Sequence, residues 1–271
     1  MKGRISKLLP RRKPATHKGD YGRVLIVAGS PGMTGAAVLA ARGALRSGAG
    51  LTYLAVPRNL VNFVDSMTPE VITLPFEKIK NIKADAIAIG PGLGVTEQTK
   101  KLLSSLVLRP TPLVIDADAL NVISKDLNIL KKAKAKAKVI ITPHPGEMSR
   151  LIKRSVEYVQ KNRVSVAKEV AQRLRCMVVL KGYKTVMAHP SGRSFTNPTG
   201  NPGMASGGVG DVLTGMLAGF LAQGIAAWEA SVLAVYLHGL AGDLAAKEKN
   251  QHGVIASDLV EKIPYAIRKI H

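Results

Sequence analysis

Apolar residues along the chain gather into short, uninterrupted runs that are separated by glycine-rich or charged segments. Runs of this length with no alternating polar residues are typical of strands that are buried on both faces of a parallel sheet. They lie at residues 24–28, 51–56, 86–89, 112–115, 139–141 and 177–180. We therefore predict a strand at each of these runs.

Helical patterns lie between and after the strands. Residues 162–174 carry apolar side chains at the 3.6-residue period of an amphipathic helix, and long apolar segments at 226–246 and 257–270 predict two more helices. A hairpin is predicted where Pro190-Ser191-Gly192 separates residues 186–189 from residues 194–196. Alternating strands and helices, followed by a helical tail, predict one α/β sandwich with a mostly parallel sheet.

Several predicted strands run directly into loops that are rich in glycine or proline. These loops are residues 29–35, 90–94, 143–147, 181–185 and 207–211. Open α/β sheets bind ligands at the carboxyl ends of their strands, so we expect the loops to share one site. The first loop contains neither the GxGxxG dinucleotide fingerprint nor the Gly-Lys-Ser/Thr of a Walker loop. Taken alone, Ala36 and Ala37 indicate close helix packing, and residues 90–94 fit a plain turn as well as a ligand loop.

One carboxylate, Asp211, stands where the glycine-rich loop within residues 197–220 becomes an apolar helix. Glycines just before it allow tight backbone turns and let a ligand approach the main chain. A helix N-terminus with outward N–H groups is an anion site, and an anion bound there would repel the carboxylate of Asp211, which is an unfavourable arrangement unless the carboxylate has a chemical role. We therefore predict that Asp211 is a catalytic base beside an anion held by the amides of Gly208 to Gly210. The alternative is that Asp211 only caps the helix.

Other titratable side chains also follow strand ends. Asp116 and Asp118 come directly after the fourth predicted strand. We expect one of them to hold a magnesium-bound water or a ribose and the other to cap the next helix. His144 is stiffened between two prolines, which makes it a candidate ligand contact as well as a structural residue. Glu147 is expected in the first turn of the following helix, where the dipole favours a carboxylate.

The composition fits one large domain without a membrane segment. The chain has 271 residues, of which 46% are hydrophobic, and we expect a basic arm at residues 1–16 and a single domain at residues 17–271. No apolar run has spanning length, and the first residues lack a secretory signal pattern. A single cysteine, Cys176, fits a reducing compartment and is expected to be a small buried hydrophobe. We therefore expect a cytoplasmic protein with no membrane partner.

The formal net charge of +21 would suit a nucleic-acid partner. However, aromatic residues make up only 4% of the chain, and no stretch alternates basic and aromatic side chains as a stacking platform would. We therefore expect no nucleic-acid partner. A polyanionic small molecule such as a nucleotide accounts for part of the charge.

The motifs together resemble one known family. In chain order they are HKGDYGRVLIVAGS (17–30), GMTGAA (32–37), GPGLG (90–94), DADALN (116–121), TPHPGE (142–147), LKGYKT (180–185), NPTGNPGMASGGVGD (197–211) and YLHGLAGD (236–243). This set resembles the NAD(P)H-hydrate dehydratase family of the ribokinase-like superfamily. TPHPGE together with NPTGNPGM and GGxGD is a specific combination. Val209 departs from the family, which usually has a hydroxyl residue there; the backbone N–H survives this change and a side-chain hydrogen bond is lost.

The resemblance implies a ribokinase-like three-layer α/β/α sandwich and a metabolite-repair lyase. Such an enzyme dehydrates (6S)-NADHX or NADPHX back to NADH or NADPH, with ADP or ATP as co-substrate. The ring hydroxyl would be phosphorylated and then eliminated. The resemblance also implies Mg²⁺ as cofactor and a homotetramer. The epimerase domain that is fused to many relatives is expected to be absent.

The family's site residues carry over to matching positions of this chain. The hydrated cofactor would contact Ala36, Gly92, His144 and Asp211, and the nucleotide would be held by Lys181, Gly182, Tyr183, Lys184, Thr185, Gly208, Val209 and Gly210. Glu147 would hold the magnesium through water. Asp211 would deprotonate the ring hydroxyl as it attacks the terminal phosphoryl, and the amides of Gly208 to Gly210 would stabilise charge on the transferred group.

Two alternatives are open at this point. A small-alcohol kinase of the same fold, acting on a hydroxymethylpyrimidine or hydroxyethylthiazole type of substrate, would use the same GxGD base. A nucleic-acid-binding protein is suggested only by the net charge, and it would bind strands tightly and in a salt-sensitive manner.

Overall fold

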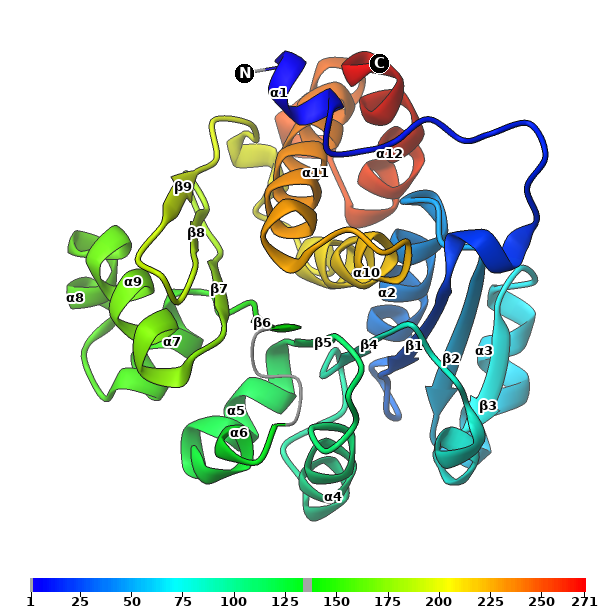
Figure 1. Cartoon of the computed structure of the whole chain (residues 1–271), viewed down its shortest axis with the longest axis horizontal. Helices are drawn as coiled ribbons and strands as arrows, with labels where there is room; N and C mark the ends of the chain where they lie inside the picture. Colours follow the sequence, from blue (N-terminus) through cyan, green and yellow to red (C-terminus); the bar gives the residue numbers. More distant parts are fainter. Residues whose placement is uncertain (1, 134–137) are drawn as a thin grey trace.

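A single mixed sheet forms the centre of the molecule (Figure 1). The computed structural model describes residues 2–133 and 138–271. Within this part of the chain the sheet has nine strands in the order β3-β2-β1-β4-β5-β6-β7-β8-β9. The strands are β1 Arg23–Val27, β2 Leu51–Val56, β3 Ile72–Pro75, β4 Ala86–Ile89, β5 Leu113–Ile115, β6 Val139–Ile141, β7 Met177–Leu180, β8 Val186–Ala188 and β9 Ser194–Thr196.

Strands β1 to β7 pair in parallel, and the β8–β9 hairpin adds two antiparallel strands at one edge. The predicted strands are confirmed, and most residues of the parallel ones are buried. Strand β3 was not predicted. It is a short strand at the other edge of the sheet, it begins with an exposed isoleucine, and it ends at Pro75, so it has no continuous apolar run for the pattern to show.

Helices cover both faces of the sheet and complete a three-layer sandwich (Figure 1). One face packs against α2 Thr34–Arg46, α3 Val61–Met67, α10 Val209–Ala222, α11 Ala227–Lys249 and α12 Ala256–Ile270. The opposite face packs against α4 Glu97–Leu106, α5 Ala117–Lys125, α6 Asn128–Lys131, α7 Pro145–Ile152, α8 Val156–Lys161 and α9 Arg163–Leu174. The predicted α/β/α class is confirmed, although the pattern gave no signal for α3, α4 or α8.

Helix α10 leads into the candidate site and is almost completely enclosed. Of its 14 residues, 12 are buried, and it lies between the sheet, α2 and α11 (Figure 1). Glycines allow α2 and α10 to approach closely: a Cβ on Gly215 would lie 1.9 Å from the carbonyl oxygen of Ala40, and a Cβ on Gly43 would lie 2.4 Å from that of Val212. The helix that carries Asp211 is therefore held by backbone-to-backbone contact.

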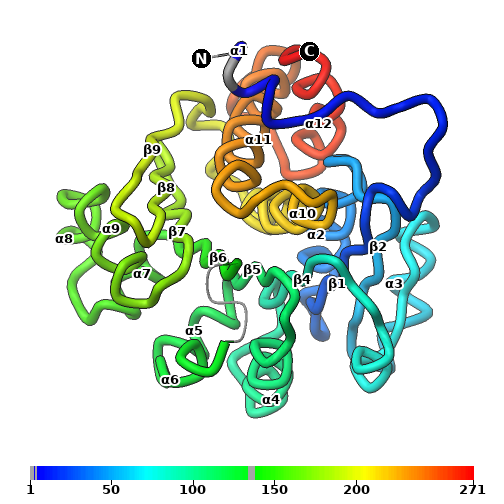
Figure 2. The backbone as a smooth tube through the Cα atoms, in the orientation of Figure 1, coloured from blue at the N-terminus to red at the C-terminus, as the bar shows by residue number. Residues whose placement is uncertain are grey.

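The first residues run along the surface from α12 to the start of β1 (Figure 2). Helix α1, Lys2–Ser6, packs against α12, and Ile5 and Leu9 are buried. Arg12 donates a hydrogen bond of 2.6 Å to the carbonyl oxygen of Gly48 and stacks over the ring of Tyr21 at 3.7 Å. Apolar burial and these contacts hold the basic segment against the rest of the chain.

Two further expectations concern single features. Cys176 is buried as predicted, and burial raises the pKa of its thiol to about 12, so it behaves as a small apolar side chain. In the described part of the chain no helix has both the length and the apolar character needed to cross a membrane.

Candidate active site

Asp211 lies in the first turn of α10, at the edge where the parallel strands end. The N-cap position is occupied by Gly208, whose φ of +85° suits glycine, and not by Asp211. The alternative interpretation of Asp211 as the helix cap is therefore wrong. The N–H of Asp211 instead bonds the carbonyl oxygen of Gly208 at 3.0 Å. The carboxylate of Asp211 therefore does not cap the helix, and it lies at the N-terminal end of α10.

A buried ion pair lies next to Asp211. Nζ of Lys181 donates to Oδ1 of Asp116 at 2.6 Å, and Oγ1 of Thr214 donates to Oδ2 of the same carboxylate at 2.6 Å. Asp116 is 1% exposed and Lys181 is 18% exposed. Oε2 of Glu147 lies 3.9 Å from the ammonium on another side. Residues from the ends of β5, β6 and β7 thus converge on the first turns of α10.

This convergence places several carboxylates around one ammonium and shifts their pKa values. Loss of hydration and then repulsion from Asp116 raise the pKa of Asp211 to about 7, against the attraction of Lys181. Burial likewise raises the pKa of Glu147 to about 7. Burial opposes the charge on Lys181, but Asp116 and Glu147 outweigh it and raise the pKa of the ammonium. A carboxyl with a pKa near neutrality can exchange a proton at working pH, which is what a general base requires.

Neither aspartate at the end of β5 caps α5 with its side chain. Asp116 occupies the N-cap position but makes no side-chain cap bond, since both of its oxygens are engaged by Lys181 and Thr214. Asp118, in the first turn of α5, accepts a bond of 2.8 Å from the N–H of Gly94. The predicted N-cap position is confirmed for Asp116, but the side-chain capping bond that the role implies is not made. These side chains tie the strand ends to each other.

His144 and Glu147 together begin α7 in a capping box. Nδ1 of His144 accepts from the N–H groups of Gly146 and Glu147 at 3.0 and 3.4 Å, and Oε2 of Glu147 accepts from the N–H of His144 at 2.7 Å. The predicted place of Glu147 in the first helical turn is confirmed. His144 keeps an exposed ring beside the carboxylate cluster, and burial followed by repulsion from Lys181 lowers its pKa.

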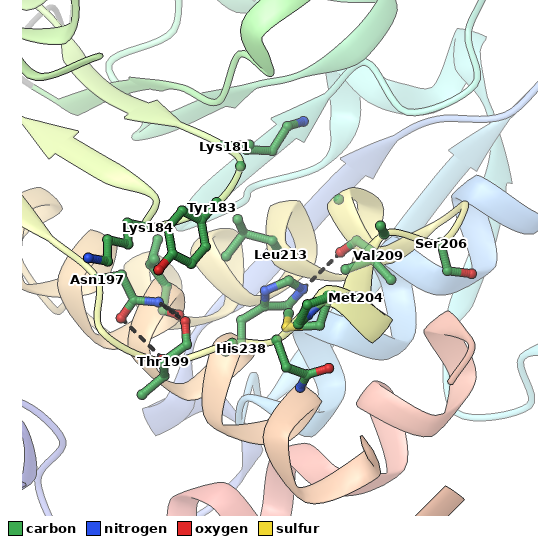
Figure 3. A pocket seen from close by; sticks show the side chains of 18 of the residues that line it. Lys181, Tyr183, Lys184, Asn197, Thr199, Met204, Ser206, Val209, Leu213 and His238 are labelled. Atoms are coloured by element: carbon green, nitrogen blue, oxygen red, sulfur yellow. Dashed lines mark hydrogen bonds between the residues drawn. The ribbon is translucent and has the colours of Figure 1, made fainter. Parts of the chain in front are cut away.

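A cavity of about 810 Å³ opens beside the cluster. Its lining comes from the segment after β7, the loop before α10, and helices α10 and α11 (Figure 3). Of the residues predicted to hold the nucleotide, those that line it are Lys181, Gly182, Tyr183, Lys184, Val209 and Gly210. Thr185 and Gly208 are not among the lining residues. The volume is within the range of small-molecule sites.

Most of the other lining residues were not expected from the sequence, and two of them, Asn197 and His238, make hydrogen bonds that hold the site together. Asn197 donates to the carbonyl oxygens of Thr199 and Val235 at 3.0 and 3.2 Å, which fixes the loop that follows the hairpin. His238 lies 2.9 Å through Nε2 from the carbonyl oxygen of Val209 (Figure 3). Burial lowers the pKa of His238 to about 4, so the ring is neutral and its Nε2–H donates. Both residues stand inside motifs that we quoted for the resemblance, but the bonds to Val235 and Val209 join positions far apart along the chain.

The residues predicted to contact the hydrated cofactor come from separate loops. Gly92, with a φ of +62°, lies against Met33 and Ala36: a Cβ on it would be 2.9 Å from the Cβ of Met33 and 3.2 Å from that of Ala36. Ala36 and Gly92 thus share one wall of the strand-end edge. They are not among the residues that line the 810 Å³ cavity. Their binding roles, with those of His144 and Asp211, stay predictions.

In the part of the chain that the structure describes, no three His, Cys, Asp or Glu side chains gather as a metal-ligand set. This does not conflict with magnesium, because Mg²⁺ in nucleotide enzymes is held by one or two carboxylates together with phosphate oxygens and water. Glu147 offers one such carboxylate, and the surplus of carboxylates over ammonium groups at the site favours a divalent cation. The residues present therefore fit a magnesium ion for which the protein supplies one carboxylate, while phosphate oxygens and water supply the other ligands.

The chain is similar in sequence to known proteins that share one activity. The family model for NAD(P)H-hydrate dehydratase matches residues 24–265. The chain is 42% identical over 278 residues to the bifunctional NAD(P)H-hydrate repair enzyme Nnr of Moorella thermoacetica, covering 97% of this chain and 52% of that one. It is 38% identical over 268 residues to the ADP-dependent (S)-NAD(P)H-hydrate dehydratase of Bacillus subtilis, covering 96% and 94%. This chain thus spans about half the length of the bifunctional relatives and nearly all of the single-function one.

A solved structure agrees with these matches. The ADP/ATP-dependent NAD(P)H-hydrate dehydratase of Bacillus subtilis, co-crystallised with ATP and Mg²⁺, superposes with a TM-score of 0.89 at 35% identity. The superposition covers 100% of this chain and 98% of that one.

Proposed function

The chain belongs to the NAD(P)H-hydrate dehydratase family, and from this membership and the geometry of its site we propose that it dehydrates (6S)-NADHX and NADPHX to NADH and NADPH. The co-substrate is an adenine nucleotide, ADP or ATP. The terminal phosphoryl is transferred to the ring hydroxyl, and phosphate then leaves as the ring loses a proton and regains its double bond. The whole process is a nucleotide-driven elimination of water.

The observation that carries this proposal is the position and protonation of Asp211. A hydroxyl of a hydrated ring is a weak nucleophile, and hydroxide is a poor leaving group, so the reaction needs both a base and a phosphoryl donor. Asp211 has a pKa raised to about 7 by loss of hydration and sits where a helix begins. It takes the hydroxyl proton as the oxygen attacks phosphorus. A solvated aspartate with an ordinary pKa would be a much weaker base.

The nucleotide lies in the 810 Å³ cavity, with its phosphates toward Lys181 and the N-terminus of α10. Three features support this orientation: the ammonium of Lys181, the backbone N–H of Gly210, which lines the cavity, and the positive end of the helix dipole. Gly210 leaves room beside the ammonium, since a Cβ there would lie 3.3 Å from Nζ of Lys181. Tyr183, which is 83% exposed on the cavity rim, supplies a face for the adenine.

Magnesium would be held by phosphate oxygens, water and Glu147, and it would neutralise charge on the phosphates. The related dehydratase of Bacillus subtilis was co-crystallised with ATP and Mg²⁺, which supports this assignment. The capping box with His144 keeps the side chain of Glu147 buried and ordered, so that its carboxylate is in place for the metal.

The test is an incubation of the purified protein with hydrated NADH, Mg²⁺ and either ADP or ATP. We expect the near-ultraviolet absorbance of the dihydronicotinamide to return only when a nucleotide is present. A matched incubation replaces hydrated NADH with hydroxyethylthiazole or hydroxymethylpyrimidine. Phosphorylation of those alcohols without restoration of NADH would favour the small-alcohol kinase, which the highly similar relatives do not support.

We also propose a homotetramer, from the family resemblance, in a cytoplasmic setting and without a nucleic-acid or membrane partner. Light scattering coupled to size exclusion measures the mass of the assembly directly; a monomeric mass would contradict it. A filter-binding assay with duplex and single-stranded DNA at low salt tests whether the net charge serves a nucleic acid.

A further inference from the structure

Asp116 is a buried carboxylate that we expected either to hold a magnesium-bound water or a ribose or to cap α5. It follows directly after β5, is 1% exposed, and has one hydrogen bond of 2.6 Å on each oxygen. Its donors, Lys181 and Thr214, lie 65 and 98 residues away along the chain. The carboxylate therefore joins three elements, namely the ends of β5 and β7 and the second turn of α10.

The main consequence falls on Lys181. A lysine side chain has a flexible four-carbon stem, so an unanchored ammonium samples many positions. Here the ammonium is held against Asp116, beside Gly210 and at the wall of the cavity. An ammonium has three donors, and the bond to Asp116 uses one of them. Glu147 at 3.9 Å is too far for a hydrogen bond, so two donors are left for an incoming phosphate.

We propose that Asp116 is a positioning residue for phosphoryl transfer, which fixes the ammonium of Lys181 against the first turn of α10. This proposal rests on the proposed function, since it assumes that phosphate binds at this corner. Asp116 does not touch the reacting atoms and acts only through Lys181. Thr214 supports it by holding the second oxygen, so that the carboxylate cannot turn away from the ammonium.

A purely structural tie between the sheet and α10 is the competing interpretation, and the two differ in what an isosteric change would do. Asparagine at position 116 keeps the shape and an acceptor for Lys181 but removes the charge. Removing a negative charge beside the phosphates does not weaken nucleotide binding. Loss of the charge-assisted bond loosens the ammonium, and a displacement of about 1 Å in a positioned group costs on the order of a hundredfold in rate.

The experiment compares Asp116→Asn with Asp126→Asn, which removes the same charge from the other end of α5. Asp126 lies outside the site, and its carboxylate accepts a hydrogen bond from the N–H of Asn128. We expect Asp116→Asn to lower kcat by roughly tenfold to a hundredfold with no weakening of ADP binding by calorimetry. Asp126→Asn should change neither quantity by more than about twofold. An Asp116→Asn enzyme that folds and keeps its kcat would overturn the proposal.

A double-mutant cycle shows whether Asp116 acts through Lys181. Lys181→Gln alone should weaken ADP binding and lower kcat. If the proposal is right, Asp116→Asn costs little more once Lys181 is replaced. An equal loss in both backgrounds would mean that Asp116 works independently of the ammonium and would contradict the proposal.

Thr214→Val supplies a second route in case Asp116→Asn does not fold. This variant keeps the charge of Asp116 and its bond to Lys181 but frees the other oxygen. We expect kcat to fall by about threefold, with ADP binding retained; an unchanged kcat would count against the proposal. Failure of the proposed function is separately visible, because the unmodified protein would then not restore NADH.

Discussion

Replacement of Asp211 by asparagine should abolish activity and at the same time stabilise the folded protein. The carboxyl of Asp211 has a pKa raised to about 7 in the folded chain, against an ordinary value of 3.8. Its charged form is therefore disfavoured by folding. At 1.36 kcal/mol per pH unit, keeping this group ionised costs the folded state up to about 4 kcal/mol.

The pH dependence of this effect has a definite sign. Because the folded-state pKa lies above the unfolded value, the wild-type protein loses stability as pH rises from about 4 to about 7. Asparagine carries no charge and escapes that loss. The two proteins should thus be nearly equal in stability at about pH 4, and the variant should be more stable by up to about 4 kcal/mol above pH 7.

Urea unfolding at several pH values measures this difference, and the NADH-restoration assay measures activity in the same preparations. Asp65→Asn, a change at an exposed position on α3, is the control and should alter the free energy of unfolding by less than about 0.5 kcal/mol at any pH. A constant difference between Asp211→Asn and wild type across the pH range would refute the desolvation argument. Normal turnover by Asp211→Asn would refute the base assignment.

Other expected outcomes use different parts of the molecule. The value of kcat/KM should rise with pH through about 7 as Asp211 ionises, so that activity at about pH 6 is roughly a tenth of its plateau; a profile that is flat between about pH 5 and 8 would contradict this. Gly215→Ala should lower the free energy of unfolding by about 2 kcal/mol or more, because its Cβ would lie 1.9 Å from a backbone oxygen of α2. In the matched variant Gly35→Ala the added Cβ meets nothing within 4 Å, so the free energy of unfolding, measured by thermal unfolding, should be unchanged or higher by up to about 1 kcal/mol. Cys176 should not react with an aromatic disulfide reagent until the protein is unfolded in urea, and rapid labelling of the native protein would show that its burial is wrong.

The fold was largely predictable because a parallel sheet covered on both faces leaves a strong local signal. Strands such as Ala86–Ile89 are apolar at every position, so each can be recognised without its neighbours. The edge strand Ile72–Pro75 lacks this signal, since only half of it is buried. Short helices such as Val156–Lys161 are held by packing more than by periodicity.

The loops that form the site could be predicted from the sequence, but most of the side-chain contacts within it could not. Glycine-rich loops at strand ends correctly marked the residues around Asp211 and Lys181. The partners of Asp116 were not predictable, because a carboxylate that precedes a helix has the local pattern of a cap. Only the folded chain shows that Lys181 and Thr214 reach it first. The same holds for His238, which contacts Val209 across two helices.

The enclosure of α10 has a consequence for the motions that accompany turnover. Because nearly all of this helix is covered by the sheet, α2 and α11, the interior amides of α10 can exchange hydrogen with solvent only when the whole domain opens. The loop at residues 200–208 has several exposed residues and far less cover. In the proposed reaction we therefore expect nucleotide to enter and leave through fluctuations of the loop, while the helix keeps Asp211 stationary throughout the cycle.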